Sequence, residues 1–266
     1  PFIAYGYTGE EVDCPLCGSD RSAVLASTDR RWKPLQSRVC LDCGLIRTNP
    51  MPTDEELAEY YRSEYRLDYQ GAGSTPPRFH LTRSRRDATE RLERLSPYLE
   101  PGAKILDFGC GSGEFVALAN ERGYDAVGFE PGDTYAAYSR DTLGIKVQHC
   151  PWQEAQYKDG AFDLVSINHV LEHLRDPVGA LKQIAAWLKP DGVMFLAVPD
   201  MRANQKPSFE RFHFAHIYGF TPSSLQAAAS AAGFVPAEHD PVQTTHEVFR
   251  LAGPDDAPIS VTDPAR

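Results

Sequence analysis

The sequence predicts an α/β fold, in which a doubly wound, mostly parallel sheet of seven strands follows a small N-terminal metal-binding module. From about residue 103, short apolar segments alternate with helical patterns, as in chains that form a parallel sheet covered by helices. Before that point, residues 1–48 contain two Cys-x-x-Cys pairs. The chain has 266 residues, enough for one domain with a sizeable core and a small module.

We expect four regions along the chain. Pro50 and Pro52 end the first module, and the Thr53/Glu56 pair after them is a capping box that starts a helix. A second helix, over about 80–98, has apolar residues at helical spacing. The predicted regions are a metal-binding module (1–50), a helical linker or lid (51–100), the α/β domain (101–252) and a disordered Pro/Asp-rich tail (253–266).

Within the α/β domain, strands and helices are expected in alternation. The predicted strands are 103–108, 126–129, 145–149, 162–167, 193–198, 234–238 and 245–251. The predicted helices are 114–122, 133–142, 177–188 and 221–232. A long loop rich in His, Phe and Tyr is expected over 199–220, next to the carboxyl edge of the sheet, where such folds bind their ligands.

Composition and charge exclude several classes of protein. Lys and Arg number 27 against 37 Asp and Glu, a net charge of −10, which opposes a broad nucleic-acid surface. No apolar run approaches the roughly 20 residues of a membrane-spanning helix. Pro1–Glu10 has neither the basic nor the apolar stretch of a secretory signal. We therefore expect a cytoplasmic protein without a membrane span.

The two Cys pairs predict a zinc site. Two residues separate Cys14 from Cys17, and two separate Cys40 from Cys43, which is the spacing of a metal-binding knuckle. A Gly follows each pair. Four thiolates in a tetrahedron suit structural Zn²⁺. Redox-active pairs and a rubredoxin-like iron centre are the alternatives. Residues 10–48 hold six basic and six acidic side chains, so the module has no basic stripe with which to bind RNA.

A Gly-rich turn between a strand and a helix predicts a nucleoside cofactor. The turn Gly109-x-Gly111-x-Gly113 lets the backbone approach a ligand closely. Glu130 ends the next strand, 21 residues after Gly109, where a carboxylate can accept hydrogen bonds from both ribose hydroxyls. Asp107, just before the turn, suits a ligand with a cationic amino group rather than the pyrophosphate of NAD. The alternative is a strand–turn–helix without a ligand.

This segment resembles the S-adenosylmethionine site of class I methyltransferases, which have a Rossmann-like fold. The resemblance covers about 103–251 and includes Asn168–Leu174, Asp176-Pro177 and Trp187–Gly192. The family often has an acidic residue after the third strand, where this chain has Cys150–Gln153. The cofactor-binding residues that the resemblance implies are Asp107, Phe108, Gly109, Cys110, Gly111, Gly113, Glu130, Pro131, Trp152, Gln153, Asn168 and His169.

A zinc module before a methyltransferase domain resembles sugar methyltransferases, notably C-methyltransferases of nucleotide-linked deoxysugars, in which the module helps to build the acceptor pocket. The segment Arg211–Phe220 looks like their acceptor loop. Related C-methyltransferases have Glu-His in that loop, where this chain has Ala215-His216, and this difference favours O-methylation.

Methyl transfer requires a group that removes a proton from the acceptor, and His is the usual base. His216 is the first candidate and His213 the second. His169 follows the fourth strand, close to the expected methyl group, and Tyr218 could orient the acceptor. Glu172 and His173 are expected to fix the start of the next helix.

The sequence therefore predicts an S-adenosylmethionine-dependent methyltransferase with structural Zn²⁺. Its expected partner is a small-molecule acceptor, the hydroxyl or carbon of a sugar on a nucleotide-sugar or glycan. The setting would be deoxysugar, surface-polysaccharide or natural-product biosynthesis. The alternatives are an RNA or protein methyltransferase that uses the zinc module for recognition, a non-catalytic cofactor-binding protein, and an NAD-dependent enzyme.

Overall fold

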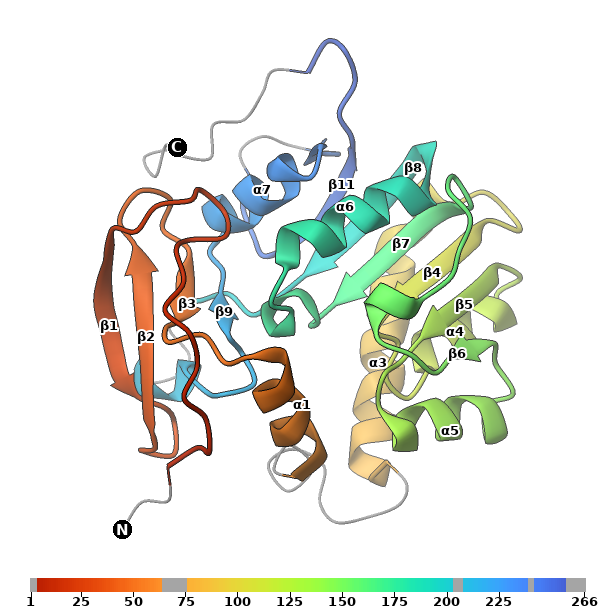
Figure 1. Cartoon of the computed structure of the whole chain (residues 1–266). Coiled ribbons are helices and arrows are strands. Elements are labelled where there is room, and N and C mark those ends of the chain that lie inside the picture. The colour runs from red at the N-terminus through yellow and green to blue at the C-terminus, as the bar shows by residue number, and fades with distance from the viewer. Residues whose placement is uncertain (1–3, 64–75, 203–207, 239–241, 257–266) are drawn as a thin grey trace.

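The computed structural model of the chain describes residues 4–63, 76–202, 208–238 and 242–256. Two sheets organise these residues, and Figure 1 shows them side by side. The larger sheet has seven strands, and the smaller one has four. The seven-stranded, mostly parallel sheet that the sequence predicted is confirmed.

The large sheet has the order β10-β11-β8-β7-β4-β5-β6. The pairs from β8 to β6 are parallel, and β11 runs antiparallel to both β8 and β10. The chain reverses its direction of travel through the sheet between β4 and β7, so their carboxyl ends form a switch point at which ligands bind. The strands are β4 (Lys104–Phe108), β5 (Asp125–Phe129), β6 (Val147–Gln148), β7 (Phe162–Asn168), β8 (Leu188–Ala197), β10 (Phe234–Pro236) and β11 (His246–Leu251).

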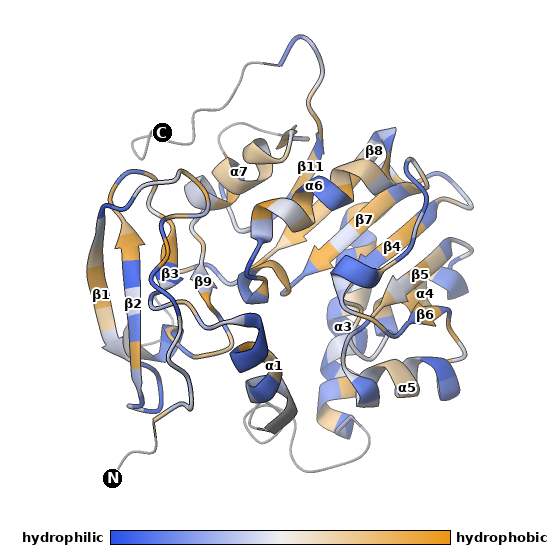
Figure 2. Cartoon of the chain, in the orientation of Figure 1, coloured by the Kyte–Doolittle hydropathy of each residue, from blue (hydrophilic) through white to orange (hydrophobic). Residues whose placement is uncertain are grey.

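Helices cover both faces of this sheet because neighbouring strand residues point to opposite sides. Ile105 packs with the α3 and α4 helices in one hydrophobic cluster, whereas Leu106 packs with α6 and α7 in another. Figure 2 shows the central strands β4 and β7 as largely hydrophobic and much of α1 as hydrophilic. The α-helices are α1 (Asp54–Ser63), α3 (Arg78–Leu95), α4 (Glu114–Glu121), α5 (Asp133–Asp141), α6 (Pro177–Trp187) and α7 (Pro222–Ala231).

The small sheet belongs mainly to the N-terminal module. It has the order β1-β2-β3-β9, with β1 (Ser22–Thr28), β2 (Pro34–Cys40), β3 (Ile46–Thr48) and β9 (Tyr218–Gly219). The β9 strand comes from the segment that was predicted as loop, and it pairs with β3. One hydrophobic cluster runs from Leu35 of the module to Phe214 and on to Leu106 of the large sheet. The module is therefore packed against the α/β domain.

Several predicted boundaries differ from the structure. The β8 strand begins at Leu188, before the predicted start, and its pairing with β7 is irregular near Phe162. The first part of the predicted tail is folded, because Asp256 accepts hydrogen bonds from Arg250 and from the Gly253 amide. Residues 257–266 of the predicted tail and residues 64–75 of the predicted linker lie outside the described residues. In the described part of the chain, no helix has the length and apolarity needed to cross a bilayer.

Candidate functional site

The Gly-rich turn joins β4 to α4 at the switch point of the large sheet. Gly109 has φ +70° and Gly111 has φ +55°, a backbone conformation that other residues rarely adopt. A Cβ on Gly109 would lie 2.8 Å from a methyl group of Val170, whereas a Cβ on Gly111 would meet no atom within 4 Å. The turn thus packs tightly on one side and leaves open space at Gly111. Such a cradle fits a ligand that lies against the backbone.

Glu130 holds the other side of this turn. One carboxylate oxygen accepts a hydrogen bond from the Gly111 amide (3.0 Å), and the other accepts one from the Gly132 amide (2.8 Å). Burial raises the pKa of Glu130 to about 7, and these two hydrogen bonds oppose that increase. The residue that the sequence analysis paired with the Gly-rich turn therefore lies next to it.

Asp107, which was expected to face the cationic group of a ligand, is paired within the protein. Its carboxylate lies 3.1 Å from Nη1 of Arg91 in α3; Asp107 is buried, and the Arg91 side chain is 12% exposed. The same Nη1 donates to Ser166 Oγ at 2.9 Å, and the guanidinium lies over the Phe115 ring. Burial raises the pKa of Asp107, although Arg91 favours its ionised form. This ion pair fixes the carboxylate beneath the turn.

The other predicted cofactor-binding residues surround the same end of the sheet. The Phe108 side chain is buried against Phe129, so only its backbone is available to a ligand. The Pro131 carbonyl lies 3.2 Å from His149 Nε2, and Trp152 is half-buried beside Phe108. The Cys110 amide donates to the Phe129 carbonyl. The remaining predicted side chains are exposed or half-buried at this edge, namely those of Gln153, Asn168 and His169.

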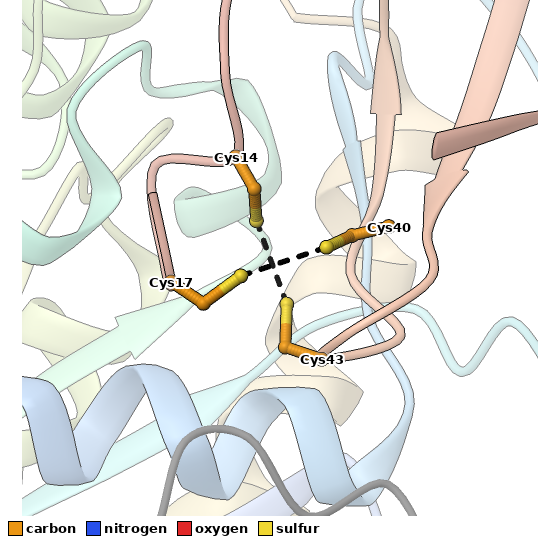
Figure 3. Close-up of side chains that lie close together, drawn as sticks. All are labelled: Cys14, Cys17, Cys40 and Cys43. Carbon is orange, nitrogen blue, oxygen red and sulfur yellow. Dashed lines mark hydrogen bonds between the residues drawn. The ribbon is translucent and has the colours of Figure 1, made fainter. Parts of the chain in front are cut away.

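The four N-terminal cysteines converge on one point, as Figure 3 shows. The Sγ atoms of Cys14 and Cys43 lie 3.4 Å apart, and those of Cys17 and Cys40 lie 3.5 Å apart. All four are free thiols, and one ion could contact all four sulfurs. The hydrogen bond between the Cys14 and Cys43 side chains lowers the pKa of Cys14 to about 5 and raises that of Cys43. Four thiols that can reach one ion fit Zn²⁺, which binds four thiolates in structural sites.

A second polar cluster surrounds Glu172 in the 3-10 helix η3 (Leu171–His173). Glu172 is 1% exposed, and neither of its oxygens has a hydrogen-bond partner among the residues that the structure describes. Its Oε1 lies 3.6 Å from His169 Nδ1 and 3.8 Å from Nε2 of both His173 and His216. Glu172 does not start the next helix as expected, because Asp176 caps α6 by accepting from the Gly179 amide. The carboxylate instead lies at the centre of three imidazoles.

Hydrogen bonds fix the tautomer of His173. Its Nδ1 lies 2.8 Å from the Ala215 carbonyl oxygen, which can only accept, so Nδ1 carries the proton. Tyr61 Oη also lies 2.8 Å from this Nδ1. Burial lowers the pKa of His173, and burial together with the neighbouring imidazoles lowers that of His216 well below its usual value. Both rings are therefore neutral near pH 7, and Nε2 of His173 carries a lone pair directed toward Glu172.

The four predicted catalytic residues differ in access to solvent. The His169 side chain is 48% exposed, whereas that of His216 is 23% exposed. His213 is buried with its ring centroid 3.6 Å from that of His216. Tyr218 is buried, and its hydroxyl donates to the Arg175 carbonyl. That arrangement does not fit the expected role of Tyr218 in orienting an acceptor, because the hydroxyl serves to join β9 to the loop before α6.

A narrow cavity of about 10 Å³, room for about one water molecule, lies between the module and the 199–220 segment. Arg47 is 1% exposed, and its Nη2 donates to the Val12 carbonyl. Its Nε and Nη1 have no hydrogen-bond partner within the described ranges. The cavity contains further groups that can bind an anion, and its lining includes Ser37, Arg47, Thr48, Arg211 and His216.

Sequence reasoning missed two of these residues, Arg91 and Arg47. Arg91 could have been found, because it lies one turn from Ala88 on the apolar face of its helix. Arg47 gave no such signal, since its contact is with a segment far away in the chain.

Comparisons with known proteins identify the family of the α/β domain. A family described as a methyltransferase domain matches residues 80–239. A ubiquinone biosynthesis O-methyltransferase of Acinetobacter baumannii (strain AYE) is 31% identical over 103 residues, which are 36% of this chain and 44% of that protein. The chain thus spans less than half of that relative.

In two further matches, the aligned region covers more than two thirds of the other protein. A ubiquinone biosynthesis O-methyltransferase of Bordetella avium is 28% identical over 192 residues, 62% of this chain and 76% of that protein. The solved structure of a SAM dependent methyltransferase from Archaeoglobus fulgidus is 23% identical, with a TM-score of 0.50, over 57% of this chain and 69% of that one. This structure supports the fold of the large sheet.

Proposed function

The chain belongs to the methyltransferase domain family, and from this premise we propose that it transfers the methyl group of S-adenosylmethionine to a hydroxyl of a small acceptor. The observation that carries the proposal is the turn at the end of β4, where Gly111 faces open space and its amide meets Glu130. The relatives named O-methyltransferase support a hydroxyl acceptor.

The residues at the switch point fit this cofactor. Glu130 would accept hydrogen bonds from the ribose hydroxyls, and the turn from Gly109 to Gly113 would lie against the rest of the nucleoside. Trp152 and Gln153 would contact the adenine. When bound, the cofactor supplies an electrophilic methyl group, and the protein has to align the acceptor and exclude water.

We assign the acceptor to sugars that carry a phosphate, such as nucleotide-sugars. Arg47 supports this assignment, because two nitrogens of its buried guanidinium lack a hydrogen-bond partner among the described residues, which favours an anion. Arg211 and His216 line the same cavity, whose side chains would have to move apart to admit a phosphate, since it holds about one water molecule. The overall charge of −10 speaks against the alternative of an RNA acceptor.

For the proton, His169 is the stronger candidate among the predicted bases. It follows β7 at the switch point, and its half-exposed imidazole would take the proton of the acceptor hydroxyl as the oxygen attacks. His169 also has φ +56°, a strained conformation for a residue with a side chain, which is typical of functional positions. We propose in addition that the four cysteines bind structural Zn²⁺.

Calorimetry with S-adenosylmethionine tests the cofactor site. Gly111→Arg should abolish binding, because the new side chain fills the space in front of the turn. Gly123→Arg is the matched control, since Gly123 also has positive φ and open space but lies after α4, away from the switch point. Unchanged affinity in Gly111→Arg, or no binding by the wild type, would contradict the proposal.

Turnover of an acceptor panel tests the substrate class. Nucleotide-sugars should be methylated in preference to neutral sugars and phenols. Arg47→Met, which keeps the volume but removes the charge, should raise the acceptor KM by about tenfold or more while the cofactor affinity stays unchanged. A preference for uncharged acceptors, or an unchanged KM, would argue against a phosphate at Arg47.

A further inference from the structure

We propose that Glu172, His173 and His216 bind a divalent transition-metal ion, distinct from the ion of the four cysteines. The three residues each offer one ligand atom, and these atoms all lie within 4.8 Å of one another. They come from two segments, since η3 supplies Glu172 and His173 and the loop before β9 supplies His216. Packing of that loop against η3 therefore assembles the set.

The buried carboxylate is the first reason to infer a cation. Glu172 is 1% exposed, and both of its oxygens lack a hydrogen-bond donor among the described residues. An ionised carboxylate in this state costs several kcal/mol unless a positive charge compensates it. Its surroundings supply imidazole nitrogens at 3.6 to 3.8 Å, which is too far for a hydrogen bond. A metal ion bound by Glu172, His173 and His216 would supply the compensating charge.

The second reason is the orientation of His173. Its Nδ1–H donates to the Ala215 carbonyl, so that Nε2 presents its lone pair toward Glu172. Metal-binding histidines almost always donate their other ring N–H to a carbonyl or carboxylate in this way. The same contact ties His173 to the residue that precedes His216. One hydrogen bond thus orients one ligand and positions the segment that carries the other.

The donor set defines the class of metal. Two imidazoles and one carboxylate form catalytic Zn²⁺ sites with an open fourth position, and the same set binds Fe²⁺ and other first-row ions. The four-cysteine site has soft donors and so selects Zn²⁺. His169 is not one of the three ligands, but its half-exposed imidazole lies 3.6 Å from Glu172, so it stays within reach of an acceptor bound at this ion.

The consequence for catalysis rests on the proposed function. A hydroxyl bound at the open position of the ion would lose its proton more readily, as a metal-bound water does. That proton would pass to His169, and the acceptor oxygen would carry the negative charge beside the ion. This assignment makes His216 a metal ligand rather than the base expected from the sequence.

Titration with Mn²⁺ tests the site without any acceptor. The protein is first loaded with one equivalent of Zn²⁺ per chain, which the four soft thiolates take first, and electron paramagnetic resonance then measures free Mn²⁺. The wild type should bind one Mn²⁺ per chain. Glu172→Gln and His216→Ala should each weaken this binding by at least about 100-fold. Loss of a metal ligand lowers the metal affinity more than loss of a hydrogen bond to a ligand, which costs about 10- to 100-fold. Glu90→Gln, on the exposed surface of α3, is the matched control.

Calorimetry with Zn²⁺ on the same zinc-loaded protein supplies a second measurement, because this ion binds such sites more tightly than Mn²⁺. The proposal is overturned if neither ion binds beyond the cysteine site, or if both ligand variants bind as the wild type does. Cofactor affinity checks that each variant is folded. A wild type that binds the second ion but no S-adenosylmethionine would contradict the proposed function and leave this inference standing.

Discussion

The protonation state of Glu130 should change when the cofactor binds. In the described structure it accepts hydrogen bonds from two backbone amides, and burial still raises its pKa to about 7. A ribose would donate two further hydrogen bonds to the ionised form. Cofactor binding should therefore favour loss of the proton from Glu130.

This coupling predicts that cofactor affinity depends on pH. Below pH 7 the free protein has a protonated Glu130, whereas the complex requires the ionised form, so affinity falls as pH falls. The dissociation constant should rise about tenfold between pH 8 and pH 6. Calorimetry at these two values measures the change, with Glu130→Gln as the control that reports the ligand's own titration. A wild type whose pH dependence equals that of the variant would show that Glu130 does not titrate on binding.

Single residues differ in how far the sequence reveals their roles. Gly109 and Glu130 were predicted to share a site because the strand–turn–helix geometry fixes their separation. The four cysteines were predicted to converge because the spacing within each pair is local. Glu172, in contrast, was assigned to a helix start, since nothing local indicates that His216 and His173 would surround its carboxylate. Such clusters depend on loop packing, which spacing alone does not encode.

Among the elements, α3 and β4 are joined by a buried ion pair. Arg91 lies on the face of α3 that also carries Ala88, Leu92 and Leu95, and it reaches Asp107 at the end of β4. The pair thereby couples the helix to the strand that leads into the cofactor turn. Loss of one partner would leave the other charge buried and alone.

Arg91→Ala should therefore lower the free energy of unfolding by about 3–5 kcal/mol, because Asp107 would remain in a low-dielectric site without its partner. Urea denaturation followed by circular dichroism measures this change. Arg86→Ala lies on the same helix with an exposed side chain and should change stability by no more than about 0.5 kcal/mol. Equal effects of the two substitutions would exclude an energetic role for the buried pair.

The elements of the large sheet were predicted well because each one has its own pattern. Apolar segments marked the strands, and Thr221 marked the start of α7, where the structure has a capping box with Ser224. The short β9 strand was missed, because two residues carry no periodicity and form a strand only by pairing with β3. The β8 strand was predicted too short, because Lys189, Pro190 and Asp191 interrupt its apolar pattern.

At the scale of the whole molecule, the N-terminal module and the α/β domain both contribute strands to the small sheet. β9 adds to the module's sheet, and Thr48 of β3 donates to the Ile217 carbonyl. His216 immediately precedes this pairing, so the module positions the loop that carries it. The cofactor turn is held within the α/β domain, by Val170 against Gly109, by Glu130 and by the Asp107–Arg91 pair beneath it.

Removal of the metal from the cysteines should therefore impair the acceptor loop and leave cofactor binding unchanged. Cys40→Ser should lose Zn²⁺, as measured by elemental analysis, and its β2–β3 hairpin should loosen. The Thr48 amide, which donates to Ile217, should then lose protection in hydrogen exchange, and acceptor turnover should fall. Cofactor affinity should stay within about twofold, since the two sites share no ligands. Cys150→Ser, outside the cluster, should keep its Zn²⁺ and its protection. If Cys40→Ser lost its metal but kept full protection and turnover, the module would have no part in holding the acceptor loop.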